Sequence, residues 1–90
     1  MFGLTQNEIC LIKDVLKRYN VHKSLVFGSR AKGNYKTTSD VDLAVDSNEA
    51  QISYFLNEES NIPYYFDVIN INKIKNKSLM DHIRRIGTEI

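Results

Sequence analysis

The 90 residues of the chain leave room for one small domain, over residues 1–90, and for no second hydrophobic core. Twelve basic and eleven acidic side chains give a net charge of +1, without the basic surplus typical of domains that grip nucleic acid, so no direct nucleic-acid binding is expected. No apolar run approaches the roughly 20 residues of a membrane span, and no charged and apolar leader precedes Thr5, so we expect a cytoplasmic protein without membrane attachment.

The first predicted helix starts at a capping box. In Thr5-Gln6-Asn7-Glu8, the Thr5 hydroxyl can accept from the Glu8 amide while the Glu8 side chain reaches back. Apolar residues then recur with helical spacing at positions 9, 12, 16 and 19, and Asn20 is the expected stop because asparagine tolerates the left-handed conformation. The single cysteine, Cys10, lies within this pattern, which excludes an internal disulfide and predicts a buried, unreactive thiol.

Strands and helices alternate along the rest of the chain. The remaining predicted elements are a strand at 24–27, a helical turn at 29–33, a polar loop at 34–38, a strand at 40–45, a helix from Ser47 or Asn48 to about Glu59, a strand at 64–71 and a helix opened by Ser78 and ended by Gly87. The predicted fold class is therefore α/β (α+β), with a small mixed sheet covered by helices in the order αβαβαβα.

Two carboxylates lie one residue apart on the second predicted strand. Because strand side chains alternate between faces, Asp40 and Asp42 project from the same face, with Val41, Leu43 and Val45 on the other. Two adjacent acids repel each other and are poor structural material unless a divalent cation lies between them. Oxygen ligands favour Mg²⁺, which usually takes one or two carboxylates together with substrate phosphate oxygens.

A glycine-containing turn precedes these acids. Gly28 ends the strand at 24–27 and would let backbone approach a phosphate, while Ser29 would offer its amide and hydroxyl at the start of a helical turn. Arg30 and Lys32 have the right charge to assist. An ordinary turn and a solvated strand edge are the alternatives for each half alone. The two halves together, in this order, indicate a metal-dependent site for a nucleoside triphosphate.

Asp67 is an anomalous acid inside the hydrophobic third strand. Alternation places it on the same face as Tyr65 and Ile69. An acid buried there without a partner would reduce the stability of the fold by roughly several kcal/mol. One interpretation is an edge strand with Asp67 turned to water. The other places Asp67 beside Asp40 and Asp42, where the three acids would hold one or two Mg²⁺ and Asp67 could accept the proton of an attacking hydroxyl.

These motifs resemble the minimal nucleotidyltransferases, of the superfamily that includes DNA polymerase beta and kanamycin nucleotidyltransferase. The resemblance rests on Gly28-Ser29-Arg30-Ala31-Lys32-Gly33, on Ser39-Asp40-Val41-Asp42-Leu43 and on Asp67, and it spans about residues 5–87. It implies a nucleotidyltransferase fold like the polymerase beta palm, with Mg²⁺ as cofactor and ATP as substrate. The implied site residues are Asp40, Asp42 and Asp67 as metal ligands and catalytic carboxylates, and Gly28, Ser29, Arg30, Gly33 and Ser39 as nucleotide-binding positions.

The resemblance also implies a protein partner. Many such minimal proteins are encoded beside a HEPN-type RNase toxin and act as its antitoxin, and some transfer AMP to a tyrosine of the toxin. The expected function is transfer of AMP from ATP to a hydroxyl of this partner, within a hetero-oligomer. Two alternatives stay open: a non-catalytic binding module that neutralises its partner by occlusion, and a small-molecule adenylyltransferase that dimerises to build its acceptor pocket.

Aromatic side chains predict where a partner would dock. Phe2, Tyr35, Tyr54 and Tyr64 are more aromatic residues than the periphery of so small a core needs, and exposed aromatic side chains are typical interface anchors. The alternative is that most of them are half-buried packing residues. The expected docking surface is the loop from Asn34 to Thr38, next to the acids.

Overall fold

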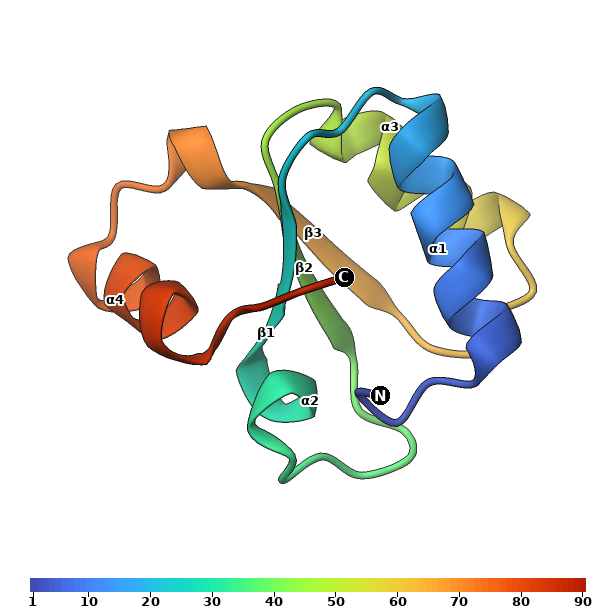
Figure 1. Ribbon diagram of the computed structural model, residues 1–90, viewed down its shortest axis with the longest axis horizontal. Helices are drawn as coiled ribbons and strands as arrows, with labels where there is room; N and C mark the ends of the chain where they lie inside the picture. Colours follow the sequence, from blue (N-terminus) through green and yellow to red (C-terminus); the bar gives the residue numbers. More distant parts are fainter.

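A four-stranded sheet with helices on both faces forms the domain, as shown by the computed structural model, which describes residues 1–90 (Figure 1). In chain order the elements are α1 (Gln6–Arg18), β1 (Ser24–Phe27), α2 (Gly28–Lys32), β2 (Val41–Val45), α3 (Glu49–Tyr54), the π-helical turn η1 (Phe55–Glu59), β3 (Phe66–Asn70), the 3-10 turn η2 (Ile71–Lys73), α4 (Lys77–Ile86) and β4 (Thr88–Glu89). None of the helices combines the length and the apolar character that crossing a membrane requires.

The sheet is mixed, with strand order β3-β2-β1-β4. β1 pairs antiparallel with both β2 and β4, whereas β2 pairs parallel with β3. A parallel pair needs a long connection that returns the chain to the same end of the sheet, and α3 with η1 supplies it. The predicted mixed sheet covered by helices is confirmed, and β4 is an additional two-residue strand that the sequence pattern did not indicate.

The capping box at the start of α1 is confirmed. The Thr5 Oγ1 accepts a hydrogen bond of 3.1 Å from the Glu8 amide, and the Glu8 Oε1 accepts one of 2.8 Å from the Thr5 amide. Asn20 follows the helix with φ of 58°, the left-handed conformation expected of a helix stop. The two hydrogen bonds between Thr5 and Glu8 fix where the helix begins, and loss of such a cap typically destabilises a protein by about 1 kcal/mol.

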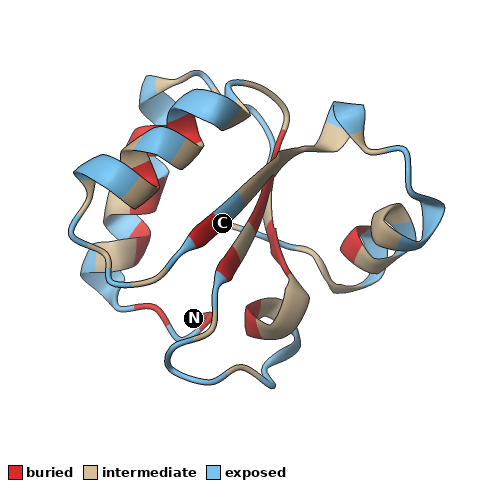
Figure 2. Cartoon of the chain, turned by 180° about the vertical axis from the view of Figure 1, so that it is seen from behind, coloured by how far each residue is buried: buried red, intermediate tan, exposed pale blue.

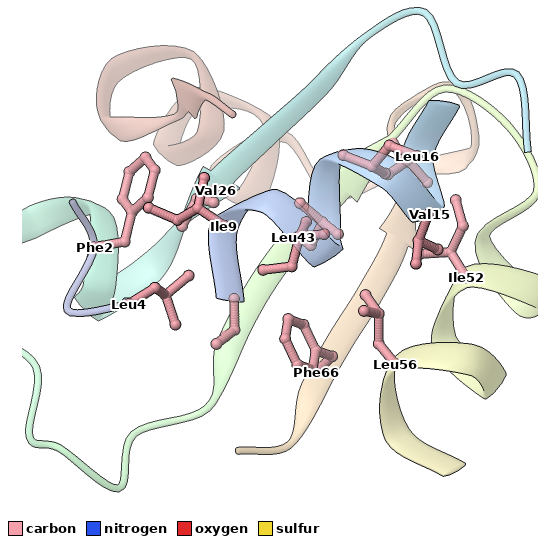
Figure 3. Close-up of a cluster of buried hydrophobic side chains, with 13 residues drawn as sticks. Phe2, Leu4, Ile9, Val15, Leu16, Val26, Leu43, Ile52, Leu56 and Phe66 are labelled. Atoms are coloured by element: carbon pink, nitrogen blue, oxygen red, sulfur yellow. The ribbon is translucent and has the colours of Figure 1, made fainter. Parts of the chain in front are cut away.

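The main core lies between one face of the sheet and the helices α1 and α3 (Figure 3). Its thirteen buried side chains are Phe2, Leu4, Ile9, Ile12, Val15, Leu16, Val26, Val41, Leu43, Val45, Ile52, Leu56 and Phe66. The predicted alternation on β2 is confirmed, because Val41, Leu43 and Val45 are fully buried on this face. Each buried side chain of this kind stabilises the fold by roughly 1.5–3 kcal/mol.

The opposite face of the sheet is only partly covered. α4 lies on this side of the sheet, with one buried stretch that faces the strands (Figure 2). Ile83 from this helix packs against Phe27 and Ala44 in a separate small cluster. Asn76 caps α4 by accepting a hydrogen bond of 3.1 Å from the Leu79 amide, so the cap lies two residues before the predicted Ser78 and the helix starts at Lys77. Gly87 ends the helix as predicted. The part of this face that α4 leaves open is available for polar side chains.

The expectation of a buried Cys10 was wrong, and of the two interpretations of the aromatic residues the one that makes most of them packing residues is confirmed. Cys10 is exposed, because it is displaced by about 100° around α1 from its buried neighbour Ile9. Phe2 is buried, and Tyr35 and Tyr64 are half-buried, so Tyr54 is the one exposed aromatic residue of the predicted set. Tyr65, which was not in that set, is also exposed.

Candidate active site

Asp42 and Asp67 lie directly beside each other on adjacent strands. In the parallel register of β2 and β3 they are paired residues, and paired residues of neighbouring parallel strands point to the same face of the sheet. Neighbouring strands lie about 4.8 Å apart, so the two side chains leave the sheet as close neighbours. This register agrees with the interpretation that places Asp67 beside Asp42. β3 is also an edge strand and Asp67 is exposed, as the other interpretation expects. The antiparallel register of β1 and β2 pairs Asp42 with Phe27, which brings Asp42 next to the turn at Gly28.

Asp40 precedes β2 by one residue and is exposed, as is Asp67, whereas Asp42 is half-buried. Burial raises the pKa of the Asp42 carboxyl above its usual value, and the negative charges of Asp67 and then Asp40 raise it further. A positive charge on the His82 imidazole would oppose these effects and lower the pKa of Asp42. Asp40 and Asp67 are thus each near enough to Asp42 to influence its carboxyl electrostatically.

The acids have the donor chemistry for Mg²⁺ but do not form a closed ligand set. No three His, Cys, Asp or Glu side chains converge into a group that could hold a metal ion, so the predicted triad geometry remains a prediction. The ion pair of the chain joins Lys73 to Glu49 and leaves Asp40, Asp42 and Asp67 without a basic partner. Uncompensated carboxylate oxygens on a partly open face fit a divalent cation, since Mg²⁺ prefers such ligands.

Gly28 is the residue that allows β1 to turn into α2 against these acids. Its φ of 71° is in the left-handed region, which a side chain makes unfavourable. A Cβ atom at this position would also collide with the carboxylate of Asp42. The absence of a side chain at Gly28 therefore lets the backbone approach Asp42 closely. The half-buried Ser29 follows in the first turn of α2.

Arg30 is directed at the backbone of the following loop. Its side chain is only 2% exposed, and its guanidinium group donates to the carbonyl oxygens of Phe2, Thr37 and Ser39. The distances to these oxygens are 2.9–3.2 Å, and Ser39 accepts from both Nε and Nη2. Through these hydrogen bonds, the Arg30 side chain fixes the conformation of the loop that leads into Asp40.

Two tyrosine rings complete the surroundings of Arg30. The guanidinium carbon lies 4.5 Å from the ring centre of Tyr64 and 5.2 Å from that of Tyr35, which are cation–π distances. Tyr35 belongs to the loop before β2, and Tyr64 comes two residues before β3. Arg30 therefore ties together the segments that precede both acid-bearing strands.

Gly33 and Ser39 also act on the loop between α2 and β2. Gly33 ends α2 with φ of 89°, and a Cβ atom there would meet nothing within 4 Å, so its requirement is conformational. The Ser39 hydroxyl accepts a hydrogen bond of 2.9 Å from the Lys36 amide and closes a turn within the loop. Of the five predicted nucleotide-binding positions, Gly28 and Ser29 lie at the turn beside Asp42, and the other three shape the loop.

His82 is a residue of this site that the sequence pattern did not indicate. It is half-buried on α4, and its Nε2 accepts a hydrogen bond of 3.2 Å from the backbone amide of Gly28. A single histidine on an amphipathic helix carries no spacing signal, and only the packing of α4 beside α2 brings it to the turn. Its position therefore became visible from tertiary structure alone.

The surface offers no enclosed pocket around the acids. Five hollows mark the surface, and none of them is lined by Asp40, Asp42 or Asp67. The largest, of about 470 Å³, lies between α4 and the β1 and β4 edge and includes Leu25 and Ile83. The face that carries the acids is open, so a second substrate could reach it directly from solution.

Comparisons with known proteins agree with this architecture. The sequence profile of the family described as polymerase beta, nucleotidyltransferase matches residues 11–90. A crystal structure described as a toxin-antitoxin with AMP-PNP superposes with a TM-score of 0.72 at 19% identity, covering 96% of this chain and 72% of that chain. A Sulfolobus solfataricus structure, provisionally described as a nucleotidyltransferase, gives a TM-score of 0.47 at 17% identity over 88% of this chain and 71% of that chain, too weak to support an argument. No curated protein matches the chain.

Proposed function

Because the chain belongs to the polymerase beta nucleotidyltransferase family, we propose that it transfers AMP from ATP to a hydroxyl group of a partner protein. The observation that carries this proposal is the in-register pair of Asp42 and Asp67 beside the Gly28 turn. Carboxylates without a basic partner, next to a turn whose first residue is a glycine, are suited to binding a triphosphate through a metal ion. They suit few structural roles, because the acids repel each other when the site is empty of cations.

The roles of the side chains follow from phosphoryl-transfer chemistry. Asp42 and Asp67, with Asp40 as the third ligand, would hold one or two Mg²⁺. Mg²⁺ would neutralise the negative charge that develops on the leaving pyrophosphate. The Gly28–Ser29 turn would contact the phosphate oxygens through its backbone and the Ser29 hydroxyl. Arg30, Gly33 and Ser39 would act on the nucleotide through the shape of the loop that presents Asp40.

The transfer itself is a substitution at the α-phosphorus. The hydroxyl oxygen of the partner forms the new bond to this phosphorus, and the bond from phosphorus to the bridging oxygen of pyrophosphate breaks. The hydroxyl proton passes to Asp67, and pyrophosphate leaves with the electron pair of the broken bond. Asp67 suits this role because it is exposed on the open face, where an incoming acceptor can reach it.

We propose that the acceptor is a helical toxin of the HEPN type, bound as a hetero-oligomer. Two observations support a protein acceptor. The open face around the acids has no pocket of its own for a small second substrate. The fold is also similar to that of a protein crystallised as a toxin-antitoxin with AMP-PNP, at a TM-score of 0.72.

Radiolabelled ATP tests the reaction type directly. The protein is incubated with Mg²⁺ and the protein encoded by the neighbouring gene, using ATP labelled at the α-phosphate in one reaction and at the γ-phosphate in another. The partner should become labelled in the reaction with α-labelled ATP and should stay unlabelled in the reaction with γ-labelled ATP. Label from the γ-phosphate would instead indicate a kinase, and a neutralised but unlabelled partner would favour occlusion.

A further inference from the structure

His82 lies beside the turn that begins α2, although it is 54 residues away in sequence. Its imidazole Nε2 accepts the hydrogen bond of 3.2 Å from the Gly28 amide, and its ring meets the ring of Phe27 edge-on with centroids 6.2 Å apart. The imidazole is therefore fixed by a packed aromatic contact on one side and a backbone contact on the other. No part of the proposed reaction described above uses this side chain.

The Gly28 amide has its acceptor on α4. The backbone at Gly28 also passes directly against the Asp42 carboxylate. A backbone amide left without a partner in a partly buried place is unfavourable, so the acceptor on α4 stabilises this conformation of the turn. Since the Gly28 amide donates, His82 Nε2 carries no proton, and the neutral ring is protonated at Nδ1.

We propose that His82 is a positioning residue of the nucleotide site, which holds the Gly28–Ser29 turn in the conformation that receives the triphosphate. This inference rests on the proposed function, since it concerns the same turn. By accepting the hydrogen bond from the Gly28 amide, His82 holds the backbone of the turn in place beside Asp42, and with it the Ser29 that follows. A turn that is ordered before the nucleotide arrives loses less conformational freedom on binding, which strengthens affinity.

Two amide substitutions separate this role from simple packing. In His82→Gln, the side-chain oxygen is as many bonds from the backbone as Nε2 and can accept from Gly28. In His82→Asn, the oxygen is one carbon shorter and cannot reach. Loss of one such hydrogen bond should weaken binding of AMP-PNP with Mg²⁺ about tenfold in His82→Asn and His82→Ala, whereas His82→Gln should stay near the wild-type affinity. Calorimetry measures all four proteins, and circular dichroism confirms that each is folded.

Nitrogen NMR of the protein without nucleotide provides an independent readout. The chain has only two histidines, so His22→Gln assigns the remaining imidazole signals to His82 and serves as a control of unchanged affinity. The His82 ring should show a proton on Nδ1 and none on Nε2, and the Gly28 amide should exchange with solvent faster in His82→Asn than in His82→Gln.

Three results would overturn the proposal. A proton on Nε2 in the neutral ring would exclude the hydrogen bond. Wild-type nucleotide affinity in His82→Ala, or equal losses in the Gln and Asn variants, would exclude the positioning role while leaving the transferase proposal intact. Failure of the wild-type protein to bind AMP-PNP with Mg²⁺ would instead remove the proposed function together with this role.

Discussion

Asp42 of β2 is the register partner of Asp67 of β3, so two like charges leave the same face of adjacent strands. Burial and this neighbouring charge raise the pKa of Asp42, which means that the folded protein binds a proton there more tightly than the unfolded chain. The stability of the metal-free protein should therefore fall as the pH rises from the ordinary aspartate value of 3.8 through the raised folded-state pKa. The arrangement costs stability at neutral pH unless a cation is bound.

Replacing Asp42 with Asn should remove this cost. The variant should have a higher thermal midpoint than the wild type at neutral pH without Mg²⁺, and the difference should vanish in acid, where Asp42 of the wild type is protonated. Thermal unfolding followed by circular dichroism across the acidic and neutral range measures this. A lower midpoint for Asp42→Asn at neutral pH would show that the carboxylate has a structural partner, contrary to this account.

Gly28→Ala should destabilise the protein more than Gly33→Ala. Both residues have positive φ, so both substitutions carry the backbone penalty of roughly 1–2 kcal/mol. Only at Gly28 does the added methyl group collide with a neighbour, the Asp42 carboxylate, because a Cβ at Gly33 meets nothing within 4 Å. Urea unfolding measures the free energy of unfolding of each variant, which should be lower for Gly28→Ala than for Gly33→Ala.

The double variant Gly28→Ala with Asp42→Ala checks the cause. Truncating Asp42 makes space for the methyl group, so the penalty at position 28 should shrink toward that of Gly33→Ala. Additive effects of the two substitutions would show that the turn and the acid are not in contact.

Arg30→Lys should destabilise the protein by about 2–4 kcal/mol, although it keeps the charge. A lysine ammonium cannot replace the planar fork that reaches the carbonyls of Phe2, Thr37 and Ser39. Lys32→Met is the matched control, because Lys32 is exposed on the same short helix and its loss should change stability little. If Arg30→Lys unfolded at the wild-type urea concentration, the buried fork would not hold the loop.

Lys36→Ala should weaken transfer to the partner and leave nucleotide affinity unchanged. Lys36 is exposed in the loop that leads to Asp40, and an acceptor hydroxyl must come within about 3–3.5 Å of the α-phosphorus, so the docking surface must border the acids. Calorimetry with AMP-PNP and a transfer assay with the partner separate the two effects. Weaker nucleotide binding with normal transfer would make this loop part of the nucleotide site and not a docking surface.

Much of the fold could be predicted because local patterns were strong. The capping box at Thr5 and Glu8 satisfies the first amides of α1 from within four residues, so it needs no tertiary contact. Alternation predicted which residues share a face with Asp42 within its own strand and with Asp67 within its own, but the register of β2 and β3 was needed to place the two acids on the same face of the sheet. Features whose contacts all lie within one element can therefore be predicted without knowing how the elements pack.

Apart from Cys10, whose exposure follows from its angular position on α1, the features that the sequence did not indicate depend on contacts between elements or on very short elements. Tyr35 and Tyr64 are half-buried where their rings lie against the Arg30 guanidinium, and no pattern in the sequence indicates that the Arg30 side chain is buried. His82 reaches Gly28 only because α4 packs beside α2. β4 is two residues long, too short for any alternation to be visible.

The most direct test of the central claim is the intact mass of the partner protein after incubation with ATP, Mg²⁺ and either the wild-type chain or Asp42→Asn. The account predicts that the wild-type chain adds the mass of one or more adenylyl groups to the partner, and that Asp42→Asn, although folded, adds none. Removing Mg²⁺ with a chelator should likewise prevent the addition. An unchanged partner mass with the wild-type chain, or equal modification by Asp42→Asn, would contradict metal-dependent nucleotidyl transfer at these acids.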